Sequence, residues 1–260
     1  MKKAFVFPGQ GAQKVGMVKD LYDSYASVRQ LFEESDDALG FSLTKLCFEG
    51  PDEELMLTYN TQPAILTAST ACNLVLKEEG FQPDIVAGHS LGEYSALVAA
   101  GSLDFADAVR TVRLRGQFMQ EDVPLGEGAM AAILGLDEEK IKSICTQIST
   151  QGATVEAVNF NCPGQIVIAG ATKAVEQAVE SMKEAGAKRA VMLNVSAPFH
   201  STLMQPAAER LAEVLDTITI RDAVIPVVAN VNGEIERTAA DIKTSLVKQA
   251  ASPVLWVKCV

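Results

Sequence analysis

A serine between two glycines, where a strand meets a helix, constrains this chain more than any other feature. Residues 85–87 are apolar and indicate a buried strand, residues 93–100 have the pattern of a helix, and Gly101 follows as an end signal. Between them lies Gly88-His89-Ser90-Leu91-Gly92. Small glycines let such a turn close sharply, so that the serine hydroxyl stands clear at the helix N-terminus. Strand, tight turn and helix in this order predict an α/β fold.

Ser90 is the candidate nucleophile of this turn. The backbone N–H of Leu91 and the dipole of the following helix can stabilise an oxyanion that forms during attack by Ser90. The alternative is a structural turn in which Ser90 only caps the helix. The flanking strand and helix favour the nucleophile. His89 is a poor base for Ser90, because adjacent side chains around a tight turn point apart.

A nucleophilic serine needs a base, and the chain has two histidines, so elimination leaves His200. His200 lies in a predicted loop, where side chains commonly project into a site. The alternative is a structural loop histidine. Since no carboxylate between Ser90 and His200 is expected at a strand end, a dyad oriented by a backbone carbonyl is more economical than a triad.

Arg115 and two asparagines are further candidates. A helix over 104–120 carries an apolar stripe with Arg115 at its edge and Arg110 on the opposite side. A guanidinium there needs an anion, which is either an internal carboxylate or a substrate carboxylate bound bidentately. Asn159 and Asn161 either line a polar pocket or shape the turn that follows them.

The middle of the chain has a different element order from the rest. It predicts strand, helix, two strands, helix and strand over 129–134, 137–148, 154–160, 165–169, 172–185 and 189–195. This βαββαβ order is that of a ferredoxin-like unit. We therefore expect a large hydrolase-like α/β subdomain with a parallel sheet, formed by 1–126 and 197–260, and a small ferredoxin-like subdomain over 127–196.

The large subdomain has its own predicted elements. A strand over 4–7 runs into a glycine-rich turn, and a helix over 62–77 has Pro63 in its first turn. A helix over 204–215 and a strand over 224–229 follow the insert.

Composition excludes several classes of function. There are 33 acidic and 22 basic residues, a net charge of -11, so a broad cationic face for nucleic acid is not available. The five cysteines are widely spaced without a C-x-x-C pair, which indicates a reducing compartment and no zinc or redox motif. No signal peptide or membrane-spanning stretch is visible, so we expect a cytoplasmic monomer that needs neither a membrane nor a metal or redox cofactor.

Seven short motifs occur in an order that is similar to one known family. They are Phe7-Pro8-Gly9-Gln10-Gly11 with Gln13, Thr61-Gln62-Pro63-Ala64, Gly88-His89-Ser90-Leu91-Gly92-Glu93, Arg115-Gly116, Asn159-x-Asn161, Phe199-His200-Ser201 and Asn230-Val231-Asn232-Gly233. On these motifs, nearly the whole chain resembles the malonyl-CoA:acyl carrier protein transacylases, and more broadly the acyltransferase domains of fatty-acid and polyketide synthases.

The resemblance implies roles for individual residues. Ser90 would take the malonyl group as an ester, and His200 would be base and then acid, held by the backbone carbonyl of Gln249. The N–H groups of Gln10 and Leu91 would form the oxyanion hole. Arg115 would pair with the free carboxylate of malonate. The remaining substrate-binding candidates are Gln62, Asn159, Asn161 and Phe199, the last of which is similar to a residue of malonyl-selective enzymes.

The implied activity is a ping-pong transfer of malonyl from malonyl-CoA to the phosphopantetheine thiol of acyl carrier protein, with the coenzyme A thioester as substrate and no cofactor. The alternatives are a serine thioesterase or esterase on the same dyad, and a truncated, non-catalytic carrier-docking module. Family members continue beyond Ser252-Pro253-Val254, and we expect a form extended by those elements to be more stable.

Acyl carrier proteins are usually acidic, so a chain at -11 needs a local basic patch to attract one. Lys188-Arg189 is the candidate, and two ordinary solvated charges are the alternative.

Overall fold

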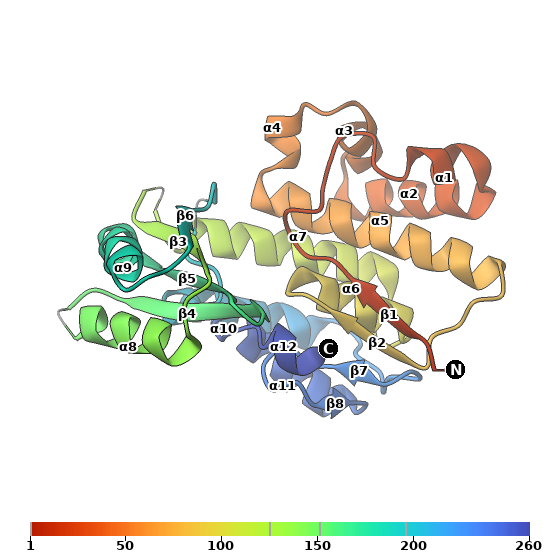
Figure 1. The fold of residues 1–260 in the computed structure, drawn as a ribbon. Helices are drawn as coiled ribbons and strands as arrows, with labels where there is room; N and C mark the ends of the chain where they lie inside the picture. Colours follow the sequence, from red (N-terminus) through yellow and green to blue (C-terminus); the bar gives the residue numbers. More distant parts are fainter. Residues whose placement is uncertain (1, 125, 151, 196) are drawn as a thin grey trace. The chain divides into compact units, whose positions relative to one another are not determined.

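The computed structural model describes residues 2–124, 126–150, 152–195 and 197–260 (Figure 1). The chain forms two compact units. The first comprises Met1–Gln117, Glu213–Ala229 and Glu234–Thr244, and the second comprises Phe118–Ala212, Asn230–Gly233 and Ser245–Val260. The subdomain boundaries expected at 126/127 and 196/197 stay a prediction.

The first unit is built on a four-stranded sheet in the order β1-β2-β7-β8. Its strands are β1 (Ala4–Phe7), β2 (Ile85–Gly88), β7 (Val227–Val228) and β8 (Ile235–Glu236). β1, β2 and β7 are parallel, whereas β8 is antiparallel to β7. Phe7 pairs with Gly88, so β1 and β2 end side by side and the loops after them begin at the same edge of the sheet. In open α/β sheets, ligands bind at this carboxyl edge.

The helices of the N-terminal half are α1 (Lys19–Ser24), α2 (Ala26–Leu39), α3 (Leu43–Glu49), α4 (Asp52–Leu55), α5 (Thr58–Glu78), α6 (Leu91–Ala99) and α7 (Phe105–Glu121). α6 packs against β1 and β2 of this sheet, and the N-terminal helices pack on α5 and form a separate hydrophobic cluster. Phe32 and Leu43 are fully buried in a cluster with Ala64 and Ala68, which joins α2 and α3 to α5. The N-terminal helices therefore stabilise the helix that carries Gln62.

The predicted position of Pro63 in the first turn of its helix is wrong. α5 begins at Thr58, and Pro63 lies inside it. Proline removes one i to i−4 hydrogen bond from a helix interior. Here the affected carbonyl, that of Tyr59, accepts a hydrogen bond from Nη1 of Arg113 at 3.2 Å. This contact across helices makes an internal proline tolerable.

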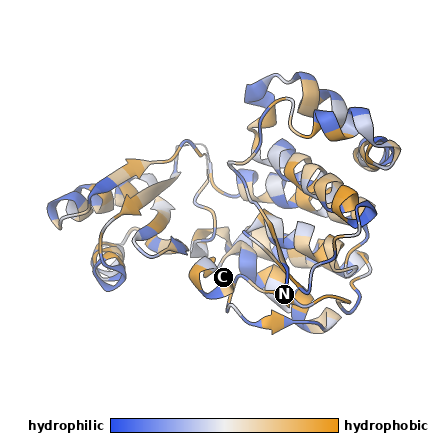
Figure 2. Cartoon of the chain, turned by 45° about the vertical axis from the view of Figure 1, so that its right-hand side comes forward, coloured by the Kyte–Doolittle hydropathy of each residue, from blue (hydrophilic) through white to orange (hydrophobic). Residues whose placement is uncertain are grey.

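The second unit contains the ferredoxin-like arrangement. Its elements are β3 (Gly128–Leu134), α8 (Glu138–Ser149), β4 (Val155–Cys162), β5 (Gln165–Ala171), α9 (Thr172–Glu184) and β6 (Arg189–Met192). The strand order is β4-β5-β3-β6, and each neighbouring pair is antiparallel. The strands are mostly hydrophobic, whereas α8 and α9 alternate hydrophobic and hydrophilic residues (Figure 2). The predicted fold class is confirmed.

The last predicted strand of that unit, 189–195, is shorter in the structure, since β6 ends at Met192. A 3-10 helix (Thr202–Met204) and α10 (Gln205–Thr217) follow. α11 (Ala239–Ala250) and α12 (Trp256–Cys259) complete the chain. Among the described residues, no helix has both the length and the apolar character needed to cross a membrane.

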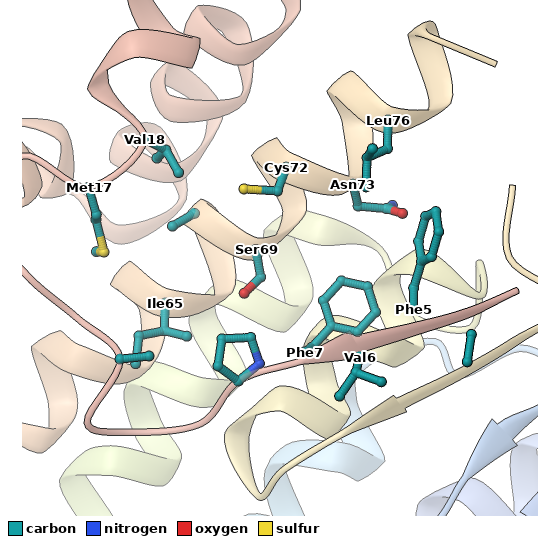
Figure 3. A pocket seen from close by; sticks show the side chains of 14 residues that line it. Phe5, Val6, Phe7, Met17, Val18, Ile65, Ser69, Cys72, Asn73 and Leu76 are labelled. Carbon is teal, nitrogen blue, oxygen red and sulfur yellow. The ribbon is translucent and has the colours of Figure 1, made fainter. Parts of the chain in front are cut away.

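An apolar pocket of about 450 Å³ lies between β1 and α5 in the first unit. Phe5 and Phe7 line it from the strand, and Ile65, Ser69 and Cys72 line it from the helix (Figure 3). None of the predicted site residues is among those that line it. The candidate chemistry therefore lies elsewhere.

Candidate active site

The turn that carries Ser90 is as tight as its sequence predicts. Ser90 has φ 52° and ψ −108°, a backbone conformation that non-glycine residues rarely adopt and that costs about 1–3 kcal/mol. A Cβ atom on Gly88 would lie 1.9 Å from the carbonyl carbon of Gly92, and one on Gly92 would lie 2.2 Å from the oxygen of Phe7. Both positions therefore require glycine, and the surrounding backbone holds Ser90 in its strained conformation.

Arg115 connects Ser90 with a third predicted residue, Gln62, within the first unit. Nη2 of Arg115 donates to Oγ of Ser90 at 3.2 Å, and Nη1 of Arg115 donates to Oε1 of Gln62 at 2.7 Å. Arg115 belongs to α7 and Gln62 to α5, so three helices supply the group. Because the guanidinium can only donate, Ser90 accepts in this contact and keeps its own proton for transfer to a base.

Arg115 is 2% exposed, and its surroundings were not anticipated from sequence. Burial lowers the pKa of Arg115, whereas the hydroxyl of Tyr94 and the carboxylate of Glu93 act in the opposite direction. The guanidinium carbon lies 5.6 Å from the centroid of the Tyr94 ring. Burial in turn raises the pKa of Tyr94 to about 12, so this phenol stays neutral. Arginine keeps its charge in proteins, and the result is a buried cation beside a nucleophile.

Gln10 and Leu91 lie after the two strands that end side by side. Leu91 is the first residue of α6, and the first N–H groups of a helix have no acceptor within it. Gln10 follows β1, and its Nε2 donates to Oγ1 of Thr58 at 3.4 Å. The oxyanion hole that the resemblance implies stays a prediction.

His200 is held in the second unit by a strained turn. Its φ is 65°, and it is 3% exposed. The N–H of Ser201 donates to the carbonyl of Pro198 at 3.3 Å, and the Ser201 hydroxyl donates to the same oxygen at 2.7 Å. These two bonds close the turn around His200. Among the described residues, only Val18, Ser90 and His200 combine a side chain with positive φ, and such strain clusters at functional sites.

The imidazole of His200 has a defined orientation. Nδ1 lies 2.8 Å from the backbone oxygen of Gln249. A carbonyl oxygen only accepts, so Nδ1 carries the proton and Nε2 of the neutral ring is the basic nitrogen. Gln249 lies in the last turn of α11, and the residue four positions later is Pro253, which has no N–H to donate back. The local sequence thus leaves this carbonyl to His200.

β4 supports the histidine from two sides. Its edge pairs with the segment that follows Gln249, through hydrogen bonds from Phe160 N–H to Val254 O at 2.9 Å and from Val254 N–H to Val158 O at 2.8 Å. The carboxylate of Glu156 accepts from the N–H and the hydroxyl of Thr202 at 2.7 and 2.9 Å. One strand therefore anchors both the carbonyl that orients His200 and the chain that leaves it.

The remaining predicted residues of the second unit lie on β4 and in the histidine turn. Asn159 is 8% exposed, and its Oδ1 is buried without a hydrogen-bond partner in the described part of the chain. Asn161 is half-buried near the end of β4. Phe199 is buried in a cluster with Met204 and Ala207. A buried amide oxygen of this kind suits a polar pocket better than a turn.

The structure thus brings the predicted residues together in two groups. Ser90, Arg115 and Gln62 are in hydrogen-bond contact in the first unit, and His200 and Gln249 are in contact in the second. The sequence did not predict that Glu93 and Tyr94 act on the pKa of Arg115. A carboxylate in the first turn of an apolar helix, Glu93, was a visible signal. In the described residues, no group of three or more His, Cys, Asp or Glu side chains could hold a metal ion.

Comparison with known proteins gives consistent matches along the chain. A family model described as "Acyl transferase domain" matches residues 4–254. The malonyl CoA-acyl carrier protein transacylase of Bacillus subtilis (strain 168) is 57% identical over 253 residues, which is 97% of this chain and 80% of that protein.

Solved structures agree with the sequence matches. An acyl carrier protein S-malonyltransferase from Vibrio cholerae O1 biovar eltor str. N16961 superposes with a TM-score of 0.97 at 51% identity, covering 100% of this chain and 85% of that one. A structure described as a type II PKS acyl-carrier protein in complex with its malonyl-transacylase contains a chain that matches with a TM-score of 0.96 at 51% identity. The match covers 98% of this chain and 83% of that one. The chain belongs to the acyl transferase domain family.

Proposed function

We propose that this protein transfers the malonyl group of malonyl-CoA to the phosphopantetheine thiol of an acyl carrier protein, through a malonyl ester on Ser90. The observation that carries the proposal is the buried Arg115 guanidinium, which donates to both Ser90 and Gln62. A cation fixed beside the acyl-accepting oxygen suits an acyl group that itself carries a carboxylate, and Gln62 keeps that cation in place.

In the first half-reaction, the Ser90 hydroxyl attacks the thioester carbonyl while Nε2 of His200 takes its proton. The backbone N–H groups of Leu91 and Gln10 stabilise the oxyanion. The carbon–sulfur bond then breaks, and the proton held by His200 leaves with coenzyme A as its free thiol. The Gln249 carbonyl stabilises the imidazolium that exists between these two proton transfers, because it accepts the Nδ1 proton throughout.

In the second half-reaction, the carrier thiol gives its proton to His200 and attacks the ester carbonyl. The ester bond breaks, and Ser90 recovers the proton from His200. A thioester and an oxygen ester are close in free energy, so the transfer runs in both directions. Asn159, Asn161 and Phe199 are proposed to line the acyl site, with the buried Oδ1 of Asn159 as a polar contact for the substrate.

The proposed location is the cytoplasm. The five cysteines are all free thiols in the structure, which suits a reducing compartment.

The proposal is tested by the intact mass of the protein after a brief pulse of malonyl-CoA, with acetyl-CoA and a Ser90→Ala variant alongside. We expect a malonyl adduct on the wild type alone, removed by added holo acyl carrier protein. Steady release of coenzyme A without an adduct and without an acceptor would instead indicate a thioesterase. Absence of both adduct and release would indicate a non-catalytic module.

A further inference from the structure

Arg113 lies two residues before Arg115 on α7 and contacts α5 where Pro63 interrupts the helical hydrogen bonding. The carbonyl of Tyr59 would accept from the N–H of residue 63, which proline lacks. Nη1 of Arg113 donates to this carbonyl at 3.2 Å and also hydrogen-bonds Oδ1 of Asn60. Arg113 therefore replaces the missing backbone donor in the first turns of α5.

Arg113 is held in this position by two aromatic rings. Its guanidinium carbon lies 4.7 Å from the centroid of Phe41 and 4.8 Å from that of Tyr59. Stacking on both rings restricts a planar cation more than a single hydrogen bond would. Burial lowers the pKa of Arg113, with Tyr59 acting in the opposite direction, and the side chain is half-buried.

The backbones of α5 and α7 approach closely at the same place. A Cβ atom on Gly116 would lie 2.6 Å from Cα of Tyr59 and 2.9 Å from the oxygen of Thr58, so no other residue fits without moving a helix. Arg115 precedes Gly116, and Gln62 precedes Pro63. The hydrogen bond between Gln62 and Arg115 therefore spans a helix crossing that Gly116 brings together and Arg113 fastens.

We propose that Arg113 is a positioning residue for acyl-group selection: by fastening the first turns of α5 to α7, it fixes where Gln62 holds the Arg115 guanidinium. The inference rests on the proposed function, because it assigns Arg115 and Gln62 to the carboxylate of the acyl group. Arg113 acts through these two residues, since it hydrogen-bonds the first turns of α5 and stacks on the rings of Phe41 and Tyr59. Small displacements of a positioned group cost large factors in rate, so loosening this crossing weakens selection.

The test compares Arg113→Met with a double variant that also carries Pro63→Ala. The measured quantity is kcat/KM for malonyl-CoA divided by that for acetyl-CoA. We expect Arg113→Met to lower this ratio about tenfold, mainly through a higher KM for malonyl-CoA. Pro63→Ala supplies an N–H to the Tyr59 carbonyl, so the double variant should recover most of the ratio. Arg110→Met is the matched control, because Arg110 is an exposed arginine on α7 that pairs with Asp107, and its ratio should equal that of the wild type.

An unchanged ratio in Arg113→Met, or a double variant that recovers thermal stability but not the ratio, overturns the proposal. If Arg113→Met does not fold, Arg113→Lys replaces it, since an ammonium group lacks the planar fork that serves two acceptors. An intermediate ratio then supports the proposal, and a wild-type ratio overturns it. Failure of the proposed function is a separate result, because wild-type protein would then show no malonyl ester on Ser90.

Discussion

At the scale of single residues, Arg115 joins a neutral acceptor, Gln62, to the nucleophile Ser90. In the proposed mechanism Arg115 makes a charge-assisted contact to the malonyl carboxylate, and removing its side chain takes away this contact, which is worth about 1.5–3 kcal/mol. We expect Arg115→Ala to reduce the malonyl-to-acetyl ratio of kcat/KM roughly tenfold to a hundredfold. The check is the rate of each acyl adduct on the enzyme by mass spectrometry. A variant that kept full discrimination would show that another cation recognises the carboxylate.

Two buried cysteines make stability depend on pH. Burial raises the pKa of Cys47 and of Cys145 to about 12 in the folded protein, from the ordinary thiol value of 9.0. Above pH 9 the unfolded chain therefore loses thiol protons that the folded chain keeps. The stabilisation is fully present below about pH 9 and is lost as pH rises toward 12.

We accordingly expect the free energy of unfolding to fall between pH 9 and pH 11, by at most about 1.4 kcal/mol per pH unit for each thiol. Urea unfolding at several pH values measures this slope. Cys145→Ala should make it shallower, whereas Cys162→Ala, which changes an exposed thiol, should leave it as in the wild type. Equal slopes for the two variants would contradict the assignment to the buried thiols.

At the scale of elements, the junction of β2 and α6 depends on glycine for space, while other turns depend on it only for conformation. A Cβ atom at Gly92 would lie 2.2 Å from the oxygen of Phe7, whereas one at Gly80 would meet nothing within 4 Å and only has to tolerate φ 81°. We expect Gly92→Ala to cost about 1–3 kcal/mol and to abolish rapid acylation, because α6 must move away from β1.

Gly80→Ala provides the comparison, with a loss of about 1–2 kcal/mol from left-handed strain and wild-type acylation. The two measurements are the urea midpoint and the amount of malonyl adduct after a short pulse. If Gly92→Ala acylated as fast as Gly80→Ala at similar stability, the close contact would not be what positions Ser90.

Elements with strong local signals could be predicted from the sequence. The turn at Ser90 follows from its glycines, and the βαββαβ order follows from alternating strand and helix patterns. The strand expected over 224–229 is shorter in the structure and comprises only Val227–Val228. Val224 does not join the sheet, because its N–H donates to the carbonyl of Ala100 and its side chain is exposed. The position of Pro63 in its helix was predicted wrongly. The backbone hydrogen bond that proline cannot make is replaced by one from Arg113 to the Tyr59 carbonyl, and no local sequence pattern contains this contact between two helices.

Some residues of the candidate site also follow from local sequence signals, whereas others do not. Ser90 and His200 follow from a motif and from elimination between two histidines, so local signals were sufficient for both. The Gln249 carbonyl came only with the family resemblance, although Pro253 four residues later gives it a physical basis. Burial lowers the pKa of Arg115, and Tyr94 and Glu93 act in the opposite direction only because the folded chain brings α6 into contact with α7.

At the scale of the whole molecule, the protein and its proposed partner carry net charges of the same sign. A chain at -11 repels an acidic carrier protein at long range, so encounter depends on local cations. Lys188 and Arg189 are exposed where β6 begins, at the edge of its sheet. A third cation of the same unit, Lys140, donates from its Nζ to the carbonyl of Ala185 at 2.8 Å, three residues before Lys188 in the chain. The exposed Lys188-Arg189 pair is therefore the candidate basic patch.

Charge reversal at this patch separates a local effect from net charge. Each Lys or Arg to Glu change subtracts two charges, so Lys188→Glu with Arg189→Glu takes the chain from -11 to -15, and so does the control, Lys45→Glu with Lys173→Glu.

We expect the first double variant to raise the KM for carrier protein about tenfold at low ionic strength, with less effect above about 0.15 M salt, where the Debye length is about 8 Å. The KM for malonyl-CoA, measured alongside, reports any general damage to the enzyme. The control should shift the KM for carrier protein far less. Lys45 belongs to α3 of the first unit, and Lys173 follows the end of β5 that pairs with Gly128, whereas Arg189 pairs with Leu134 at the opposite end of β3. Equal shifts in both variants would mean that only net charge matters, and no shift in either would mean that the carrier protein does not use this patch.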